Sequence, residues 1–452
     1  MKTINPVSDK VIKSYSKLND DEIVEAINGG QIAFDDWKYT GFPQRSVLMK
    51  KAADVLKENS EKYARLITNE MGKTITESLA EIEKCAWVCE YYADNAEEFL
   101  KNKIVETDNS KSYVRFDPLG IIFAVMPWNF PFWQVFRFAA PTLMAGNVGL
   151  LKHSSNVQGC ALAIDEVFKE AGFPANVFQS LLIDQKQVPD IISNKYIKAV
   201  TLTGSVGAGK SVAAIAGKYA KKSLLELGGS DPYIILKDAD IDKASKLCVK
   251  SRMINAGQSC IAAKRFIVVE DVYESFVEKT VEYMKSYKMG DPLDKNTKLG
   301  PMASKRHRDI VHQQVVDSVK KGAKCLLGGE IPNMAGAYYP ATILTNVWQD
   351  MPAYDDEIFG PVASIIKVKD ADEAIKIAND SAFGLGGAIF SADIDYAEKL
   401  ASRMDVGNMA INDFVKSDPR LPFGGVKDSG YGRELAEFGI YEFVNIKTII
   451  VS

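Results

Sequence analysis

Short apolar runs that alternate with amphipathic segments constrain the fold of this chain more than any other feature. The runs at 120–126, 148–152 and 197–202 are almost wholly apolar and have the length of strands buried on both faces. Helical periodicity follows the last two runs, at 159–171 and 208–219. Because strands that alternate with helices pair in parallel through helical crossovers, the pattern predicts a doubly wound α/β sheet.

The same alternation begins again further along the chain. Strands are predicted at 233–236 and 265–269, and helices at 241–255 and 272–287, while a helical segment from 20 to 100 precedes the first sheet. The chain has 452 residues, and a single hydrophobic core stops growing at roughly 250–300 residues. We therefore expect two α/β domains.

The apolar stretch Phe443–Val451 reads as a strand with no partner close to it in the sequence. An unpaired strand edge promotes aggregation. We therefore expect this strand to pair with the sheet of another subunit, in a homodimer or homotetramer.

Composition limits the classes of partner. A formal net charge of −4 with 25% charged residues gives no excess of basic side chains for nucleic acid or acidic lipid. No apolar run reaches the roughly 18 residues of a membrane span, and the first residues lack the apolar centre of a signal peptide. We expect a cytoplasmic protein that binds neither nucleic acid nor membrane.

The six cysteines have no repeated spacing, which indicates reduced thiols and predicts no metal site. Cys260 is distinctive because it ends the run NAGQSC and follows Glu226 of the run LELGG. A thiolate nucleophile and a carboxylate that activates water can form and then hydrolyse a covalent intermediate. The three histidines lie in no nucleophile signature, so a cysteine protease is disfavoured.

A second motif indicates a different chemistry. Gly204–Ser211 matches the P-loop pattern G-x-x-x-x-G-K-[ST], follows a predicted strand and opens a helix. In a P-loop ATPase, Lys210 would reach the phosphates, Ser211 would hold Mg²⁺ and Asp238 would complete the metal site. A glycine-rich turn before a helix suits the pyrophosphate of a dinucleotide equally well. These eight residues alone favour neither interpretation, and the ATPase remains the alternative of another class.

Six motifs in order resemble the aldehyde dehydrogenase superfamily and cover nearly the whole chain. They are MPWNFP (126–131), LTGS (202–205), LELGG (225–229), GQSC (257–260), DEIFGP (356–361) and PFGGVK (422–427). Several motifs in a fixed order are far more specific than one motif, so the P-loop match is taken as accidental. The chain is most similar to the NADP-accepting succinate-semialdehyde dehydrogenases.

The resemblance implies a division of the chain into three parts. A doubly wound, Rossmann-like cofactor domain would comprise residues 1–99 and 119–228. An α/β catalytic domain would comprise 229–433. A β oligomerisation arm would comprise 100–118 and 434–452.

The resemblance also implies a catalytic role for three side chains. Cys260 would attack the aldehyde carbon, and the Asn129 amide, with the backbone N–H of Cys260, would stabilise the oxyanion. After hydride transfer to the nicotinamide, Glu226 would deprotonate the water that cleaves the thioester, which gives a carboxylic acid.

The cofactor contacts follow from the same resemblance. Glu357 would bind the nicotinamide ribose, Phe359 would position the ring, Trp128 would line the tunnel, and the turn at Gly204 and Ser205 would lie beside the cofactor.

Two further residues predict which cofactor is preferred. Many NAD-specific relatives carry glutamate at the position of Ser155, where it bonds the ribose 2′-hydroxyl and repels a 2′-phosphate. Ser155 removes that repulsion, and Lys152 offers a cation. We expect NADP to be preferred, with NAD possible.

Arg137 and Trp133 are the expected substrate-binding residues. The relatives that act on succinate semialdehyde carry arginine at the place of Arg137, where a guanidinium can pair with a distal carboxylate. Ser417 and Arg420 are expected to add weaker contacts. The expected reaction is oxidation of succinate semialdehyde to succinate, and the aromatic lining leaves other short aldehydes (aliphatic, aromatic or hydroxy-aldehydes) as alternatives.

Overall fold

The computed structural model describes residues 1–452, and its first hundred residues form mainly helices, as their periodicity predicts. They are α1 (Asp20–Trp37), α2 (Phe42–Glu58), α3 (Ser60–Met71) and α4 (Ile75–Phe99). A short hairpin of β1 (Lys2–Ile4) and β2 (Val11–Ser14) precedes them. Asn19 begins α1 with a capping box that includes Glu22, which satisfies backbone N–H groups at the helix start. None of the helices is both long and apolar enough to span a bilayer.

Six strands form the first sheet in the order β19-β9-β8-β5-β6-β7. They are β5 (Ile121–Met126), β6 (Val148–His153), β7 (Phe178–Ser180), β8 (Ile197–Thr203), β9 (Lys222–Glu226) and β19 (Gly430–Tyr431). The crossovers contain α5 (Trp133–Met144), α6 (Gln158–Glu170), α7 (Val188–Ser193) and α8 (Val206–Lys218). All pairs are parallel except that of β19 with β9. The doubly wound sheet is confirmed, and the three strands and two helices predicted for it lie within two residues of their observed ends.

The strand order of this sheet reverses direction beside β5. From β5 the chain adds β6 and then β7 on one side, and afterwards β8 and then β9 on the other. In open parallel sheets, the crevice beyond the carboxyl ends of the strands at such a reversal is where dinucleotides bind. The carboxyl ends of β5 and β8 therefore mark the position of the site.

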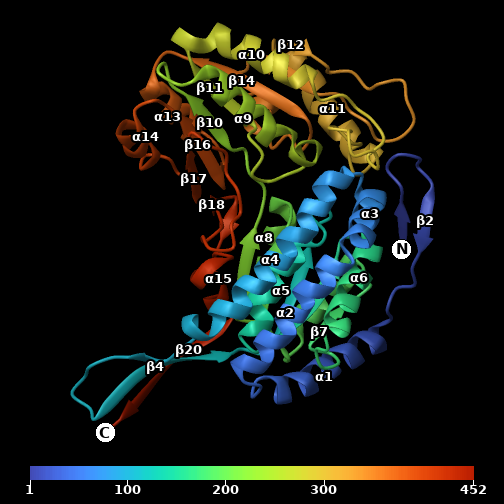
Figure 1. Ribbon diagram of the computed structural model, residues 1–452, viewed down its shortest axis with the longest axis vertical. Coiled ribbons are helices and arrows are strands. Elements are labelled where there is room, and N and C mark those ends of the chain that lie inside the picture. Colours follow the sequence, from blue (N-terminus) through green and yellow to red (C-terminus); the bar gives the residue numbers. More distant parts are fainter.

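Seven strands form the second sheet in the order β12-β13-β14-β11-β10-β16-β17. They are β10 (Pro232–Ile235), β11 (Arg265–Val269), β12 (Lys324–Leu327), β13 (Thr342–Thr345), β14 (Val362–Val368), β16 (Gly386–Phe390) and β17 (Asn408–Ile411). Its helices include α9 (Ile241–Met253), α10 (Tyr273–Lys285), α11 (Lys305–Lys320), α13 (Ala371–Asn379) and α14 (Ile394–Ala401). Figure 1 shows this sheet and its helices at one end of the molecule and the first sheet with α1 to α6 below it.

The helix predicted to run to residue 255 ends at Met253 instead. Asn255 and Ala256 have φ values of 53° and 51°, in the left-handed region. Tertiary contacts hold this segment in a short 3₁₀ turn, Ile254–Gly257, where helical periodicity predicted another turn of α-helix.

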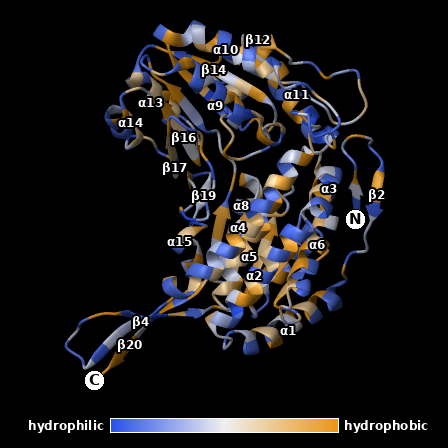
Figure 2. Ribbon diagram, in the orientation of Figure 1, coloured by the Kyte–Doolittle hydropathy of each residue, from blue (hydrophilic) through white to orange (hydrophobic).

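The final strand, β20 (Val444–Val451), pairs along its whole length with β4 (Lys111–Pro118) of the same chain. β3 (Lys103–Ile104) completes a three-stranded antiparallel sheet that projects from the body of the molecule (Figure 1). This pairing joins the two segments that were expected to form one β arm, and the pairing of the strand with another subunit's sheet stays a prediction. The outer edge of β20 has no partner within the chain, and Figure 2 shows hydrophobic residues in this strand, of which Ile446 is 62% and Ile450 is 61% exposed.

Candidate active site

The expected site residues gather at the carboxyl ends of neighbouring strands in the first sheet. Trp128 and Asn129 follow β5, Gly204 and Ser205 follow β8, and Glu226 is the last residue of β9. Parallel strands bring their carboxyl ends to one edge, which explains why motifs far apart in the sequence meet there.

Cys260 reaches this edge from the loop between α9 and β11, and its backbone is tightly fixed. Gly257 has a φ of 75°, and a Cβ there would lie 2.1 Å from the carbonyl oxygen of Gly360, so only glycine fits. The backbone N–H of Asn255 donates to Glu77 Oε1 at 2.7 Å, and its side-chain amide donates to the carbonyl of Asn129 at 2.7 Å. The loop is thus bonded both to α4 and to the segment after β5.

The Cys260 thiol is half-buried and close to charged groups. Burial raises its pKa to about 12, against the opposing effect of the nearby Lys264 ammonium. The Lys264 Nζ donates to the backbone carbonyls of Ser259 and Cys260 at 2.9 and 2.7 Å. The thiol is therefore protonated near neutral pH in the free protein, and it needs a base or an added positive charge to become the reactive thiolate.

Asn129 offers a hydrogen-bond donor beside this thiol. Its Nδ2 donates to the carbonyl of Gln258 at 3.1 Å, which fixes the amide and leaves the second amide hydrogen unused. The backbone N–H of Cys260 also makes no hydrogen bond within the chain. Two unused donors next to a thiol are the arrangement that stabilises an oxyanion on the carbon that the thiol attacks.

Cys260 lies between two cavities and lines both. The first cavity, of about 280 Å³, is lined by apolar and aromatic side chains, among them Phe130, Trp133 and Phe423, and its charged lining residues are Glu77, Glu81, Lys84, Arg137 and Lys416. The second, of about 260 Å³, is lined by Trp128, Asn129, Gly204, Ser205, Glu357 and Phe359. A substrate bonded to Sγ in the first cavity can therefore be reached by a molecule bound in the second cavity.

Arg137 and Trp133 lie in the first cavity, as the sequence predicts, but Arg137 is already paired. Its guanidinium forms a buried ion pair with Glu434 and lies 4.9 Å from the centre of the Phe423 ring. Ser417 also lines the cavity. Arg420 does not line it, because it pairs with Asp418 at 2.7 Å on the surface.

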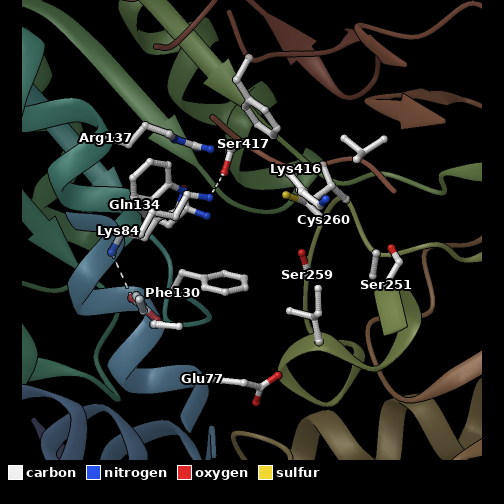
Figure 3. Close-up of a pocket in the computed structure, with 18 of the residues that line it drawn as sticks. Glu77, Lys84, Phe130, Gln134, Arg137, Ser251, Ser259, Cys260, Lys416 and Ser417 are labelled. Carbon is white, nitrogen blue, oxygen red and sulfur yellow. Dashed lines mark hydrogen bonds between the residues drawn. The ribbon is translucent and has the colours of Figure 1, made fainter. Parts of the chain in front are cut away.

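Lys84 was missed by the sequence analysis, and it lines the same cavity. Its Nζ donates to Ser417 Oγ at 2.7 Å and lies 4.3 Å from the centre of the Trp133 ring. Figure 3 shows Lys84, Ser417 and Arg137 together on one side of the cavity and Cys260 across from them. No sequence motif marks Lys84, because it lies within an ordinary amphipathic helix.

The second cavity is lined by residues that were expected to contact a nicotinamide nucleotide. Glu357 accepts from the backbone N–H of Gly229 at 3.0 Å and pairs with Lys264 at 3.3 Å. A Cβ at Gly228 would lie 2.4 Å from Glu357 Oε2, so this glycine makes room for the carboxylate. Phe359 packs edge-on against Trp128, with 5.8 Å between the ring centres.

His307 lines this cavity as well and stacks on Trp128, with 4.7 Å between the ring centres. In the sequence His307 lies in no nucleophile signature, and nothing else there marks it as a site residue. His307 lies in the first turn of α11, a helix that packs with the second sheet. It reaches the cavity only through the tertiary fold, so no local sequence pattern could have shown its position.

Lys152 and Ser155 lie outside this cavity, at the carboxyl end of β6, which pairs with β5. Lys152 is buried, and its Nζ donates to the carbonyl of His153 at 3.4 Å. Burial lowers the pKa of Lys152. Ser155 is exposed in the turn after the strand. Both positions are one strand away from the crevice, on the side where the adenosine half of a dinucleotide would extend.

Glu226 is buried and lines neither of the two cavities. Neither carboxylate oxygen has a hydrogen-bond partner, and burial raises the pKa of Glu226 well above its ordinary value. An unpaired carboxylate in such surroundings holds its proton, because the charged form is poorly solvated. To activate water at Cys260, this side chain must rotate toward the cavities and lose its proton.

The residues of the P-loop alternative do not assemble a triphosphate site. Lys210 pairs with Asp428 at 2.9 Å on the exposed side of α8. Asp238 follows β10 in the other sheet, where it accepts hydrogen bonds from Ser391. The geometry therefore gives no support to an ATPase.

Comparisons with known proteins agree with this geometry. The family model described as "Aldehyde dehydrogenase family" matches residues 1–449. The chain is 48% identical to a probable succinate-semialdehyde dehydrogenase [NADP(+)] of Synechocystis sp. over 100% of this chain and 99% of that protein. It is 46% identical to succinate-semialdehyde dehydrogenase [NADP(+)] 1 of Mycobacterium tuberculosis, with the same coverage. The crystal structure of succinic semialdehyde dehydrogenase from Streptococcus pyogenes in complex with NADP+ superposes with a TM-score of 0.98 at 39% identity, over 100% of this chain and 99% of that chain.

Proposed function

The chain belongs to the aldehyde dehydrogenase family and is an NAD(P)-dependent oxidoreductase, and we propose that it oxidises succinate semialdehyde to succinate with NADP. The observation that carries this proposal is the position of Cys260 between an aldehyde-sized cavity with cationic side chains and a cavity that fits a nicotinamide nucleotide. The names of the relatives support both the substrate and the cofactor.

The first half of the reaction forms a covalent adduct on Cys260. The Cys260 thiol loses its proton to solvent, and the positive charge that an oxidised nicotinamide ring would bring to the second cavity favours the thiolate. Sγ then attacks the aldehyde carbon, and the unused hydrogen of the Asn129 amide and the backbone N–H of Cys260 donate to the oxyanion. When bound, NADP accepts the hydride that this adduct loses. A thioester on Cys260 remains, and the amide donors that held the oxyanion are already positioned for its hydrolysis.

The second half of the reaction hydrolyses this thioester. We assign the general base to Glu226, which ionises and turns from its buried position toward the cavities, and then removes a proton from water. Because burial raises the pKa of Glu226, hydrolysis should accelerate as the pH rises and the carboxyl group loses its proton. The product is a carboxylic acid.

The cationic side of the first cavity supports a substrate that carries a carboxylate away from the aldehyde. Lys84, Arg137 and Ser417 lie there together, across from the sulfur (Figure 3). Trp133 lines the same cavity, with its ring centre 4.3 Å from the Lys84 Nζ. A charged hydrogen bond to a carboxylate is roughly twice as strong as a neutral one. A neutral aldehyde of the same length gains none of this energy.

The substrate proposal is tested by comparing succinate semialdehyde with butanal, which has the same carbon chain without the carboxylate. With NADP, kcat/KM for succinate semialdehyde is expected to exceed that for butanal by about 10²-fold or more. The measurement is the absorbance of reduced cofactor at several concentrations of each aldehyde. Equal or faster oxidation of butanal would show that the substrate is one of the other short aldehydes.

The cofactor preference is expected to depend on the side chain at 155. Replacing Ser155 with glutamate should lower kcat/KM for NADP by about 10²-fold while that for NAD stays within a few-fold, since a carboxylate there repels the 2′-phosphate. Steady-state kinetics with each cofactor measures the ratio. Ser155→Ala is the matched control and should keep the NADP preference, because it adds no charge. An NADP preference that survives Ser155→Glu would place the 2′-phosphate elsewhere.

We also propose that the protein is a cytoplasmic homodimer or homotetramer assembled through an arm formed by residues 100–118 and 434–452. The exposed outer edge of β20, with Ile446 and Ile450 on it, supports the assembly. The six cysteines are all unpaired, which supports a reducing compartment. The same proposal divides the remainder into a cofactor part, 1–99 and 119–228, and a catalytic part, 229–433, although β19 of the latter pairs with β9 of the former.

A further inference from the structure

We propose that Lys84 is the specificity-determining cation of the first cavity, and that its ammonium supplies the uncompensated positive charge that binds the distal carboxylate of the substrate. The proposal rests on the proposed function, because it concerns how the same site recognises a carboxylated aldehyde. It assigns to Lys84 the part that the sequence assigned to Arg137 alone.

Arg137 contributes little uncompensated charge to the cavity. Its guanidinium is paired with Glu434, and the side chains of the pair are 1% and 4% exposed. Glu226, also buried, lies close enough to affect the same group electrostatically. A buried guanidinium without a counter-ion would be strongly destabilising, so at least one of these two carboxylates is ionised and cancels its charge. An arriving carboxylate therefore competes with Glu434 for Arg137.

Lys84 has no such counter-ion. No carboxylate lies within ion-pair distance of its Nζ, whose contacts are the Ser417 hydroxyl at 2.7 Å and the Trp133 ring at 4.3 Å. Both partners are neutral. An ammonium carries three hydrogens, and Ser417 takes only one of them. The remaining donors are available to a ligand in the cavity that Lys84 lines (Figure 3).

The other charged side chains of the cavity and its surroundings are occupied elsewhere. Glu77 accepts from the backbone N–H of Asn255 at 2.7 Å and from Thr74 Oγ1 at 2.8 Å, and Lys416 pairs with Asp413 at 2.7 Å. Glu81 forms a buried ion pair with Lys73 and accepts from the backbone N–H groups of Phe132 and Trp133 at 2.8 and 3.0 Å. Asp418 pairs with Arg420. The positive charge of Lys84 is therefore balanced only from a distance, and a substrate carboxylate would be its first direct counter-ion.

The surroundings of Lys84 make this charge responsive to a ligand. Burial and then the neighbouring Arg137 lower the pKa of Lys84 to about 8, against smaller raising effects of Cys85, Asp418 and Glu81. A bound carboxylate favours the ammonium and raises that pKa again. Affinity for an anionic aldehyde should therefore be lost as the pH rises above about 8, while affinity for a neutral aldehyde is unaffected by this group.

The test compares Lys84→Met, which keeps the length of the side chain, with Lys84→Arg, which keeps its charge. With NADP, Lys84→Met is expected to raise KM for succinate semialdehyde about 10- to 100-fold and to leave kcat/KM for butanal within about twofold. Lys84→Arg should restore most of the affinity. It should also move the alkaline rise in KM to higher pH, because guanidinium stays charged there.

The matched control is Lys57→Met. Lys57 is an exposed lysine of α2 that pairs with Glu90, and Glu90 lies on α4, the helix that contains Lys84. It should leave KM and kcat/KM for both aldehydes unchanged, and thermal unfolding should show that all variants are folded. If Lys84→Met lowers kcat/KM equally for the two aldehydes, the role of Lys84 is structural and the proposal is overturned. An unchanged KM for succinate semialdehyde would also overturn it and would leave Arg137 as the anchor. If the unmodified protein shows no preference for succinate semialdehyde over butanal, it is the proposed function that fails.

Discussion

Replacing Cys260 with alanine is expected to lower the rate of NADP reduction by succinate semialdehyde by at least about 10⁴-fold. The sulfur is the only nucleophile that lines both cavities, so no other side chain can hold an acyl group that both the aldehyde cavity and the cofactor cavity adjoin. The measurement is the absorbance of reduced cofactor at saturating aldehyde and NADP.

Two controls separate lost chemistry from lost structure in this variant. The Cys260→Ala protein should unfold at nearly the same temperature as the unmodified protein, because Cys260 is half-buried and alanine removes a single heavy atom. It should also bind NADP with a similar Kd, measured by quenching of tryptophan fluorescence. Activity above about 1% in a folded variant would show that the thiol is not the nucleophile, because removal of a nucleophile costs far more.

Replacing Glu226 with glutamine is expected to stop the reaction after the first half. Turnover should fall by about 10²–10⁴-fold, since a general base contributes that much. A rapid burst of one reduced cofactor per active site should remain, because the thioester forms before the base is needed. Stopped-flow absorbance separates the burst from the slow steady state.

The pH dependence of the unmodified protein provides an independent check on Glu226. Its pKa is raised by burial, so the fraction that is ionised grows with pH through the range where an ordinary carboxylate is already fully charged. The steady-state rate should therefore rise with pH, and the slow rate in Glu226→Gln should not follow the same curve. Loss of the burst in Glu226→Gln would contradict the assignment and would place Glu226 before hydride transfer.

Local pattern was sufficient to predict most of the fold. The buried strands at 148–153 and 197–203 are mostly apolar and are flanked by helical periodicity. Both the kind of element and its position in the sequence could therefore be predicted. The end of α9 was missed because left-handed φ values at Asn255 and Ala256 are set by hydrogen bonds to Glu77 and Asn129, far away in the sequence. Local pattern could not show the pairing of β20 with β4 either, since β4 lies more than 300 residues earlier, and only the family resemblance placed both segments in one arm.

The sequence revealed the residue types of the site more readily than their electrostatic state. Cys260, Asn129 and Glu357 line the same cavity. All three were identified from sequence motifs, because a motif marks positions where the chemistry allows few other side chains. The ion pair between Arg137 and Glu434 joins segments that no motif relates, and it changes what Arg137 can offer to a substrate. Lys84 is recognisable only once α4 is seen to line the cavity.

A mass spectrum of Glu226→Gln, quenched in acid shortly after mixing with succinate semialdehyde and NADP, would identify the residue that carries the acyl group. The peptide containing Cys260 is expected to gain the mass of one succinyl group, and mild alkali should remove that group, as expected of a thioester. The same peptide from a sample without NADP should be unmodified, because the adduct cannot be oxidised. An acyl group on any other residue, or a burst of reduced cofactor with no acyl group on Cys260, would contradict the account.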